Sequence, residues 1–371
     1  MGARCGSAAA FLLRATGYRF GDEKAAAELA RSSVCLEEPE QRRALLRHAS
    51  YHELEPLLHA VEEDCARLRH PLVLPGEVRE EWAAAFTREG ARAALIQLGA
   101  ERALSALARG GIEVIALKGF YLAARCYERK GARGFRDLDL LVREGDLPGL
   151  HRSLLDAGFV PAPERPSFVP APAYTVYALP LAESGMAMEI DVHIGMHWPA
   201  EYERRTSLRV SDIWDRALEE ESGALSFSAM CPEHLAITTL LDLAVNHRYA
   251  RLVKFRDLLE ILRSRELDWD MLADQARSWR VRSFVAPGLL YLRSIDLACG
   301  IPDGLIDSLL PDYASMRCFL RALPPEAIPA HRSRSFSPAN LLFFLLADEW
   351  PERCCGAAHI PGHLARGRHR F

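Results

Sequence analysis

The chain has 371 residues, of which 49% are hydrophobic and 26% are charged, and its formal net charge is -4. This length allows about two or three ordinary domains, and the composition is that of a soluble globular protein. The charge gives no strong nucleic-acid signal, no apolar run is long enough to span a bilayer, and nine scattered cysteines favour the reduced thiols of a cytoplasmic protein over a disulfide framework.

Helical patterns fill the first part of the chain. Leucines recur at helical spacing between residues 37 and 63, but Pro56 divides this span into two helices or kinks it. A long helix rich in alanine and leucine is expected from about Glu77 to Arg109. The pair Gly110-Gly111 then ends it as a C-terminal cap.

The pattern changes to alternating strands and helices after this glycine pair. Residues 112–117 read as a buried strand that ends at Lys118 and Gly119, and residues 120–128 return to helix. After a glycine-containing loop comes a strand with Asp137 and Asp139. Side chains two residues apart on a strand point to the same face, so we expect these carboxylates to lie side by side.

A second acidic strand is expected further on. Residues 174–181 and 186–194 are predicted to form a strand pair, and its second strand places Glu189, Asp191 and His193 on one face. Adjacent carboxylates repel each other unless a positive charge lies between them, and Mg²⁺ prefers carboxylate oxygens. The alternative is a solvated strand face with unrelated aspartates.

From Cys231 onward the sequence is predicted to be helical again. Helices are expected over residues 232–249, 255–265, 269–279, 287–299 and 301–310. Lys254 and Asp257 have the spacing of an ordinary ion pair within a helix. The expected organisation is a helical region (1–109), a central core (110–215), a helical bundle (216–325) and a partly irregular tail (326–371).

These motifs, taken in order, resemble a known family. The set comprises Leu117-Lys118-Gly119, Arg133, residues 137–142 and Asp191-Val192-His193. It resembles the nucleotidyltransferase superfamily of DNA polymerase β and, more closely, the bacterial family called uncharacterised nucleotidyltransferases. The helical segment with His247, Lys254 and Asp257 is similar to the C-terminal part of that family.

The resemblance implies an α+β fold, with a small mixed sheet flanked by N-terminal and C-terminal helical regions. It implies a metal-dependent nucleotidyltransferase that moves a nucleoside monophosphate from an NTP, with ATP favoured, to a hydroxyl group and releases pyrophosphate. The acceptor is left open among a small molecule, a peptide and RNA. Two Mg²⁺ ions, or alternatively Mn²⁺, would be held by Asp137, Asp139 and Asp191.

The resemblance also assigns roles to other side chains. Lys118, Gly119 and Arg133 would contact the nucleotide phosphates, because backbone amides at a helix start favour anions. His193 and His247 are candidate contacts to the acceptor or to a transferred proton. The chain departs from the superfamily at Phe120, where a second small residue is usual.

Two alternatives follow from the same residues. A catalytically silent relative would bind a nucleotide or a partner protein without transfer, and Phe120 favours this interpretation. A metal-dependent phosphohydrolase could use the same carboxylates, but it is disfavoured because no histidine–aspartate metal cluster accompanies them in the sequence.

Overall fold

A computed structural model describes residues 7–162, 174–181, 186–196, 205–222, 225–333 and 337–348. The proline-rich segment at residues 161–172 and the end of the expected irregular tail, residues 349–371, lie wholly or almost wholly outside these ranges. No helix within them is both long and apolar enough to cross a bilayer.

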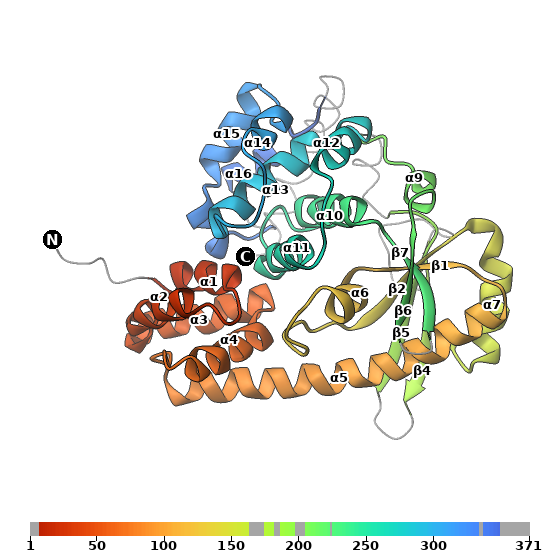
Figure 1. The fold of residues 1–371 in the computed structure, drawn as a ribbon, viewed down its shortest axis with the longest axis horizontal. Coiled ribbons are helices and arrows are strands. Elements are labelled where there is room, and N and C mark those ends of the chain that lie inside the picture. The colour runs from red at the N-terminus through yellow and green to blue at the C-terminus, as the bar shows by residue number, and fades with distance from the viewer. Residues whose placement is uncertain are drawn as a thin grey trace.

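A mixed sheet forms the centre of the fold, as expected for the α+β class (Figure 1). Its seven strands lie in the order β3-β4-β5-β2-β1-β7-β6. The pairs β2–β5 and β1–β7 are parallel and the other pairs are antiparallel. The strands are β1 (Val114–Leu117), β2 (Asp137–Val142), β3 (Val160–Pro161), β4 (Tyr174–Leu181), β5 (Met186–His193), β6 (Leu218–Ser222) and β7 (Leu225–Ala229).

The hairpin of β6 and β7 was not predicted from the sequence. Strand β6 contains the run Glu219-Glu220-Glu221, which shows no alternation of apolar and polar residues. The strand lies at the edge of the sheet, where charged side chains are tolerated because one side of the strand has no neighbour. Strand β7 does alternate, because two serines separate Leu225, Phe227 and Ala229, so the local signal is missing in β6 alone.

The N-terminal helices lie beside the sheet, and the longest of them, α5, extends from these helices to the sheet. The expected helix after residue 76 is confirmed as α5, which has 34 residues and runs beneath the sheet in Figure 1. A Cβ atom on Gly99 would lie 2.9 Å from Met188 Sδ, so glycine allows α5 to approach β5 closely. The N-terminal elements are α1 (Ala8–Gly17), α2 (Glu23–Ser33), η1 (Val34–Glu37), α3 (Pro39–His52), α4 (Glu55–Arg67) and α5 (Gly76–Arg109).

The break predicted near Pro56 is confirmed, since α3 ends at His52 and α4 begins at Glu55. Two short helices connect the strands of the core. Helix α6 (Lys118–Arg125) follows β1, and α7 (Leu147–Asp156) follows β2 and the turn η2 (Glu144–Asp146).

The C-terminal helices form a second group above the sheet (Figure 1). Two predictions within it were wrong. The helix expected to reach Tyr249 changes to a π turn at Asp242, and the helix expected to begin at Pro287 begins at Arg282 and contains the proline. The elements are α9 (Val210–Trp214), α10 (Pro232–Leu241), η3 (Asp242–Asn246), α11 (Leu252–Ser264), α12 (Trp269–Ser278), α13 (Arg282–Ile295), α14 (Leu305–Leu309), α15 (Ala314–Ala322), η4 (Pro325–Ala330) and α16 (Pro338–Phe343).

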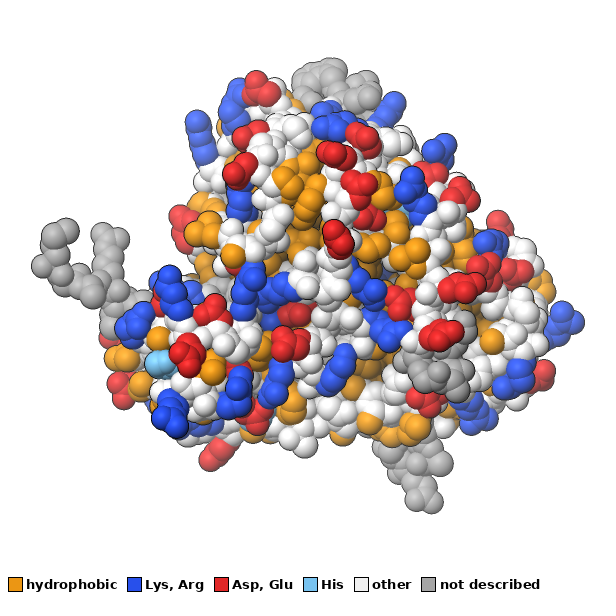
Figure 2. All heavy atoms as spheres, in the orientation of Figure 1, with side chains coloured by type: hydrophobic (Ala, Val, Ile, Leu, Met, Phe, Trp, Pro, Cys, Tyr) orange, Lys and Arg blue, Asp and Glu red, His pale blue; other side chains and the backbone are white. Residues whose placement is uncertain are grey.

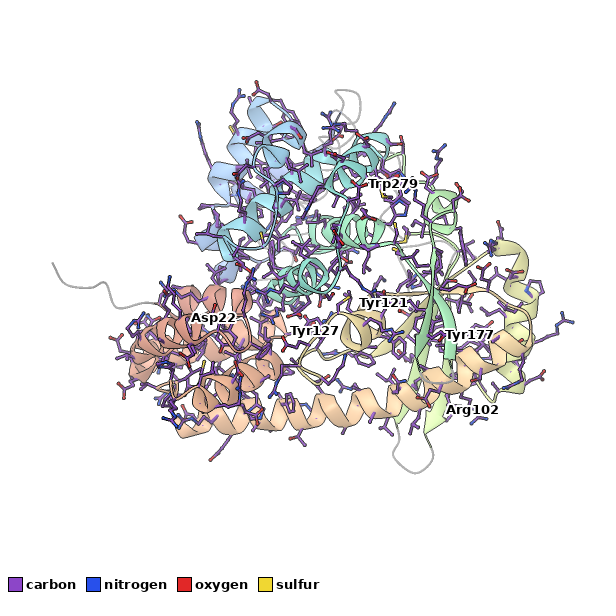
Figure 3. The ribbon with its side chains drawn as sticks, in the orientation of Figure 1. Asp22, Arg102, Tyr121, Tyr127, Tyr177 and Trp279 are labelled. Carbon is purple, nitrogen blue, oxygen red and sulfur yellow. The ribbon has the colours of Figure 1, made fainter. Side chains whose placement is uncertain are left out.

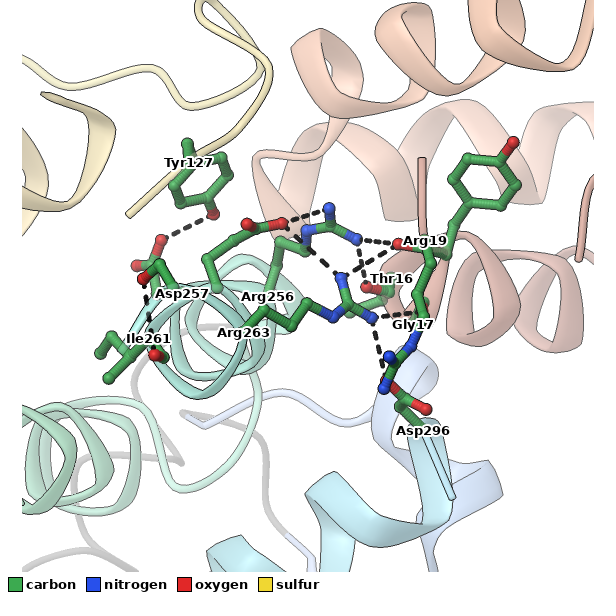
Figure 4. A network of polar contacts seen from close by, with 12 residues as sticks. Thr16, Gly17, Arg19, Tyr127, Arg256, Asp257, Ile261, Arg263 and Asp296 are labelled. Carbon is green, nitrogen blue, oxygen red and sulfur yellow. Dashed lines mark hydrogen bonds and ion pairs between the residues drawn. The ribbon is translucent and has the colours of Figure 1, made fainter. Parts of the chain in front are cut away.

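Arginine side chains, one of them fully buried, connect the N-terminal helices to the C-terminal group (Figure 4). Arg256 on α11 donates to the carbonyl of Thr16 at 3.1 Å, and Arg263 donates to that of Gly17 at 2.7 Å. Both carbonyls lie at the C-terminus of α1, where cations are favoured by the helix dipole. Asp296 after α13 accepts from Arg263 at 3.0 Å and from Arg19 at 2.9 Å, so one network joins α1, α11 and α13.

A neutral histidine makes a second connection between these groups. His52 Nε2 lies 2.8 Å from the carbonyl oxygen of Pro329, and its Nδ1 accepts from the amide of Leu252 at 3.2 Å. The ring is fully buried, and burial is the main cause that lowers its pKa from 6.5 to about 3. A second proton would have no acceptor, because Nδ1 already faces an N–H group.

We therefore expect acid to destabilise the fold partly through this histidine. The unfolded chain takes up a proton near pH 6.5 and the folded chain does so only near pH 3, so stability falls as the pH drops between these values. In His52→Gln, the slope of unfolding free energy between about pH 6 and pH 4 should decrease by about 1.4 kcal/mol per pH unit. Urea titrations measure this slope, and equal slopes for the two proteins would contradict the assignment.

The exposed surface carries charges of both signs. Figure 2 shows acidic and basic side chains interspersed over the face in view, with hydrophobic side chains between them. This mixture agrees with the small net charge of the chain, -4. No single sign of charge dominates this face, so a specific site must be sought in local clusters.

Candidate active site

Two neighbouring strands bring the acidic residues together. On β2 the side chains of Leu138 and Leu140 are fully buried, which directs Asp137 and Asp139 to the opposite face. Because β5 runs parallel to β2, Asp139 lies directly across from Asp191. The face of β5 that bears Met188 packs on α5, so the acidic face is turned away from that helix.

Asp139, Asp191 and His193 form a cluster suited to a metal ion. One ligand atom from each lies within 4.8 Å of the other two. His193 Nε2 is 2.8 Å from Asp139 Oδ1, and both side chains are almost completely buried. Two carboxylates suit Mg²⁺, and the imidazole also suits Mn²⁺. His193, predicted to contact the acceptor, thus lies among the candidate metal ligands.

Asp137 lies beside this cluster and adds another carboxylate to the same face of the sheet. It is in register with Glu189, two residues before Asp191. Burial and the charges of Asp139 and Asp191 raise its pKa to about 7. Burial alone would raise the pKa of Asp139 too, but Lys118 and His193 outweigh it and hold that pKa below its usual range. The carboxylates on these two strands therefore repel one another, and a divalent cation bound between them would relieve this repulsion.

Lys118 begins α6 directly after β1. Its backbone φ is 49°, in the left-handed region that a residue other than glycine rarely adopts. The ammonium Nζ of Lys118 lies 3.1 Å from Asp139 Oδ1. Burial acts to lower the pKa of this ammonium, but the charges of Asp139 and Asp242 outweigh burial and raise the pKa. The strained turn thus directs a cation at the acidic strands, which is a common feature of functional sites.

Gly119 and Phe120 pack toward the core. A Cβ on Gly119 would lie 3.0 Å from Phe135 Cβ, so a larger residue would crowd the loop before β2. The ring of Phe120 is buried and meets Phe135 edge to face, with ring centroids 5.9 Å apart. Phe120 is therefore not among the described residues that line the adjoining pocket.

A pocket of about 580 Å³, open to solvent, adjoins the acidic strands. Its lining comes from β1, α6, the end of β5, α10, η3 and α11. The apolar part consists of Leu117, Leu122, Met196, Met230 and Leu235. The polar part consists of Lys118, His193, Thr238, Thr239, Asp242, Asn246 and Lys254. Such a mixture is typical of a small-molecule site.

The lining of this pocket includes a second ion pair, which the sequence did not reveal. Asp242 opens the π turn and accepts from Asn246 at 2.8 Å, and Lys254 Nζ is 2.8 Å from the same carboxylate. His247 Nε2 lies 3.8 Å from it. The expected pairing of Lys254 with Asp257 was wrong. A lone aspartate within the apolar run of residues 240–245 was the only signal, and π turns often mark functional sites.

Asp257 pairs instead with Arg133. The guanidinium donates to the carboxylate at 2.8 Å and 3.1 Å. Tyr127, which is labelled in Figures 3 and 4, donates its hydroxyl to the same carboxylate at 2.8 Å, and Figure 4 marks this contact. Asp257 is fully buried and Arg133 nearly so. Arg133, predicted to contact phosphate, lies outside the described lining of the pocket and connects the loop before β2 to α11.

Comparisons with known proteins identify a family that matches most of the chain. A family model described as "Uncharacterised nucleotidyltransferase" matches residues 38–295. Among solved structures, an antigenic nucleotidyltransferase-like protein from Paracoccidioides brasiliensis is similar at 13% identity, covering 56% of this chain and 92% of its own, with a TM-score of 0.32. None of the curated proteins compared matches the chain.

Proposed function

The chain belongs to the uncharacterised nucleotidyltransferase family, and from this membership we propose that it transfers a nucleoside monophosphate from an NTP to a hydroxyl group. The observation that carries the proposal is the parallel pairing of β2 with β5. This pairing sets Asp139 across from Asp191, and Asp139 contacts Lys118 and His193, which line the pocket together with Lys254.

Asp137, Asp139 and Asp191 would hold Mg²⁺ or Mn²⁺, with His193 as a further ligand. When bound, the cation would neutralise phosphate charge and lower the pKa of the attacking hydroxyl. The donor set fits this role, because Asp139, Asp191 and His193 place ligand atoms within 4.8 Å of one another, and the charges of Asp139 and Asp191 raise the pKa of Asp137.

The side chains of the pocket would bind and orient the nucleotide. Lys118 and Lys254 both line the pocket, and each now neutralises a carboxylate that it could exchange for a phosphate. The amide of Gly119 at the start of α6 would add an uncharged donor. The apolar wall offers a surface for the base, although nothing in it selects ATP over other NTPs.

In the proposed reaction, the acceptor oxygen forms a bond to the α-phosphorus. The bond from that phosphorus to the oxygen bridging to the β-phosphorus breaks, and pyrophosphate leaves. The hydroxyl proton passes to a carboxylate on the acceptor side, for which Asp191 is proposed. His247, next to the Asp242–Lys254 pair, would contact the acceptor. Catalysis of this kind depends on positioning and charge neutralisation.

The structure changes the support for both alternatives to nucleotidyl transfer. The phosphohydrolase was disfavoured for lack of a histidine–aspartate cluster, but His193 beside Asp139 supplies one, so that objection no longer holds. The silent relative drew its support from Phe120, whose ring is buried on Phe135 and leaves the pocket open.

A single assay distinguishes these possibilities. The protein is incubated with Mg²⁺ or Mn²⁺, each α-³²P-labelled NTP and a cell extract as the source of acceptors. Pyrophosphate release with a new labelled product supports transfer. Orthophosphate release would indicate a phosphohydrolase, and binding of NTP by calorimetry without release would indicate a silent relative. Absence of both binding and release would overturn the proposal.

A further inference from the structure

Two arginines from distant parts of the chain lie over the ring of Tyr51 on α3, and a third arginine lies one turn earlier on the same helix. The guanidinium carbons of Arg251 and Arg332 lie 4.5 Å and 3.7 Å from the centre of the Tyr51 ring. Arg47 is exposed one turn earlier on the same helix. We call Arg47, Arg251, Arg332 and Tyr51 the Tyr51 cluster.

The cluster has more positive than negative charge. Glu53 is the nearby carboxylate, and its oxygen lies 3.8 Å from Arg251. Burial and the charges of Arg251 and Arg47 lower the pKa of Arg332, although a guanidinium stays charged at any working pH. Mutual repulsion of these arginines would be relieved by an anion supplied from outside the chain.

Two of the arginines have N–H groups available for such an anion. Arg332 is largely used within the fold, since it donates to the carbonyls of Pro329 and His331 and to His48. Among the described residues, Arg47 has no hydrogen bond or ion pair, and Arg251 has only the long ion pair with Glu53. Guanidinium groups are the side chains best matched to phosphate oxygens.

The cluster lies next to the part of the pocket lining that contains Lys254. Arg251 immediately precedes α11, and Lys254 is in the first turn of that helix. His247 connects the two places, because its ring is 3.8 Å from Asp242 in the pocket and both Arg251 and Glu53 act on its charge. The four residues of the Tyr51 cluster are not among the described residues that line the pocket, so a phosphate bound by them would lie beside the pocket and not in it.

We propose that the Tyr51 cluster binds a phosphate group of the acceptor, so that the acceptor is a phosphate-bearing molecule with a free hydroxyl. Naming this ligand the acceptor rests on the proposed transfer function, whereas the anion site itself does not. A sugar phosphate and the phosphorylated end of an RNA both carry a phosphate and a free hydroxyl. They differ in how many further contacts each can make with the protein.

The test uses the full chain and inorganic phosphate as the probe. Calorimetry is run at low salt with EDTA, because without a divalent cation Lys118 and Lys254 stay paired with carboxylates. Wild type should bind phosphate, and the double variant Arg47→Gln/Arg251→Gln should bind it at least about tenfold more weakly, since two charge-assisted contacts are lost. Absence of phosphate binding to wild type, or equal affinity in the double variant, would overturn the proposal.

Arg43→Gln is the matched control, because this arginine is also exposed on α3 and lies one turn before Arg47. It should bind phosphate like wild type, and a loss equal to that of the double variant would show a general charge effect and refute the site. If the double variant has a lower unfolding midpoint, Arg47→Gln alone, on the exposed side of α3, repeats the test.

Two further measurements separate this inference from the transfer function. Binding of Mn²⁺-NTP should be the same in the double variant and wild type, so loss of phosphate binding with intact nucleotide binding assigns the effect to the Tyr51 cluster. Ribose 5-phosphate and a 5′-phosphorylated RNA trinucleotide are then compared as ligands. Weaker binding of either one to the double variant supports the site, and the tighter ligand identifies the source of the phosphate. No change for either would count against it.

Discussion

Asp191→Asn is expected to lose nucleotidyl transfer while keeping the fold. Asp191 lies across from Asp139 and belongs to the candidate metal cluster with His193. Residues that only support a metal ligand typically contribute about 10–100-fold, so loss of a ligand itself should cost at least about 100-fold in kcat/KM. The measurement is the initial rate of pyrophosphate release at several metal concentrations.

The stability of the Asp191→Asn variant should not fall along with its activity. Replacing Asp191 removes one of the charges that raise the pKa of Asp137 to about 7, so that pKa should fall toward its ordinary value. The unfolding free energy without metal should then be unchanged or higher. Glu189→Gln is the control, because it removes a charge from the same strand face without removing a residue of the metal cluster. Full activity in Asp191→Asn would refute the mechanism.

Local patterns were sufficient to predict the strands that carry the acidic site. Alternation on β2 and β5 predicted which side chains share a face, and the glycines after α5 predicted where that helix ends. The convergence of Asp139 and Asp191 followed only from the family resemblance, because two strands separated by more than 40 residues can pair in several ways. The structure supplies the parallel register that brings them together.

The remaining polar pairs left no local signal. Arg133 and Asp257 are 124 residues apart, and a helical spacing suggested a different partner for Asp257. The pairing of Lys254 with Asp242 depends on the π turn, which redirects the chain between α10 and α11. Ion-pair partners chosen by tertiary packing cannot be read from charge spacing along one helix, because several partners have suitable spacing.

Asp257→Ala is expected to be among the most destabilising single changes in this chain. The variant leaves the Arg133 guanidinium buried without its carboxylate and removes the acceptor of the Tyr127 hydroxyl. Breaking a buried ion pair in this way costs about 3–5 kcal/mol. Urea unfolding measures the change. As a control, Asp274→Ala breaks the exposed pair with Arg277 on α12 and should cost less than about 1 kcal/mol.

The same substitution tests whether this ion pair holds α11, which carries Lys254, in place relative to the acidic strands. Arg133 lies in the loop before β2, and Asp257 lies one turn after Lys254 on α11, so their ion pair fixes the lysine relative to the acidic strands. Adding Arg133→Met to Asp257→Ala removes the orphaned charge and should restore part of the stability. It should not restore the affinity for NTP, because the link between α11 and the acidic strands is still missing. Recovery of both together would show that the pair only stabilises the fold.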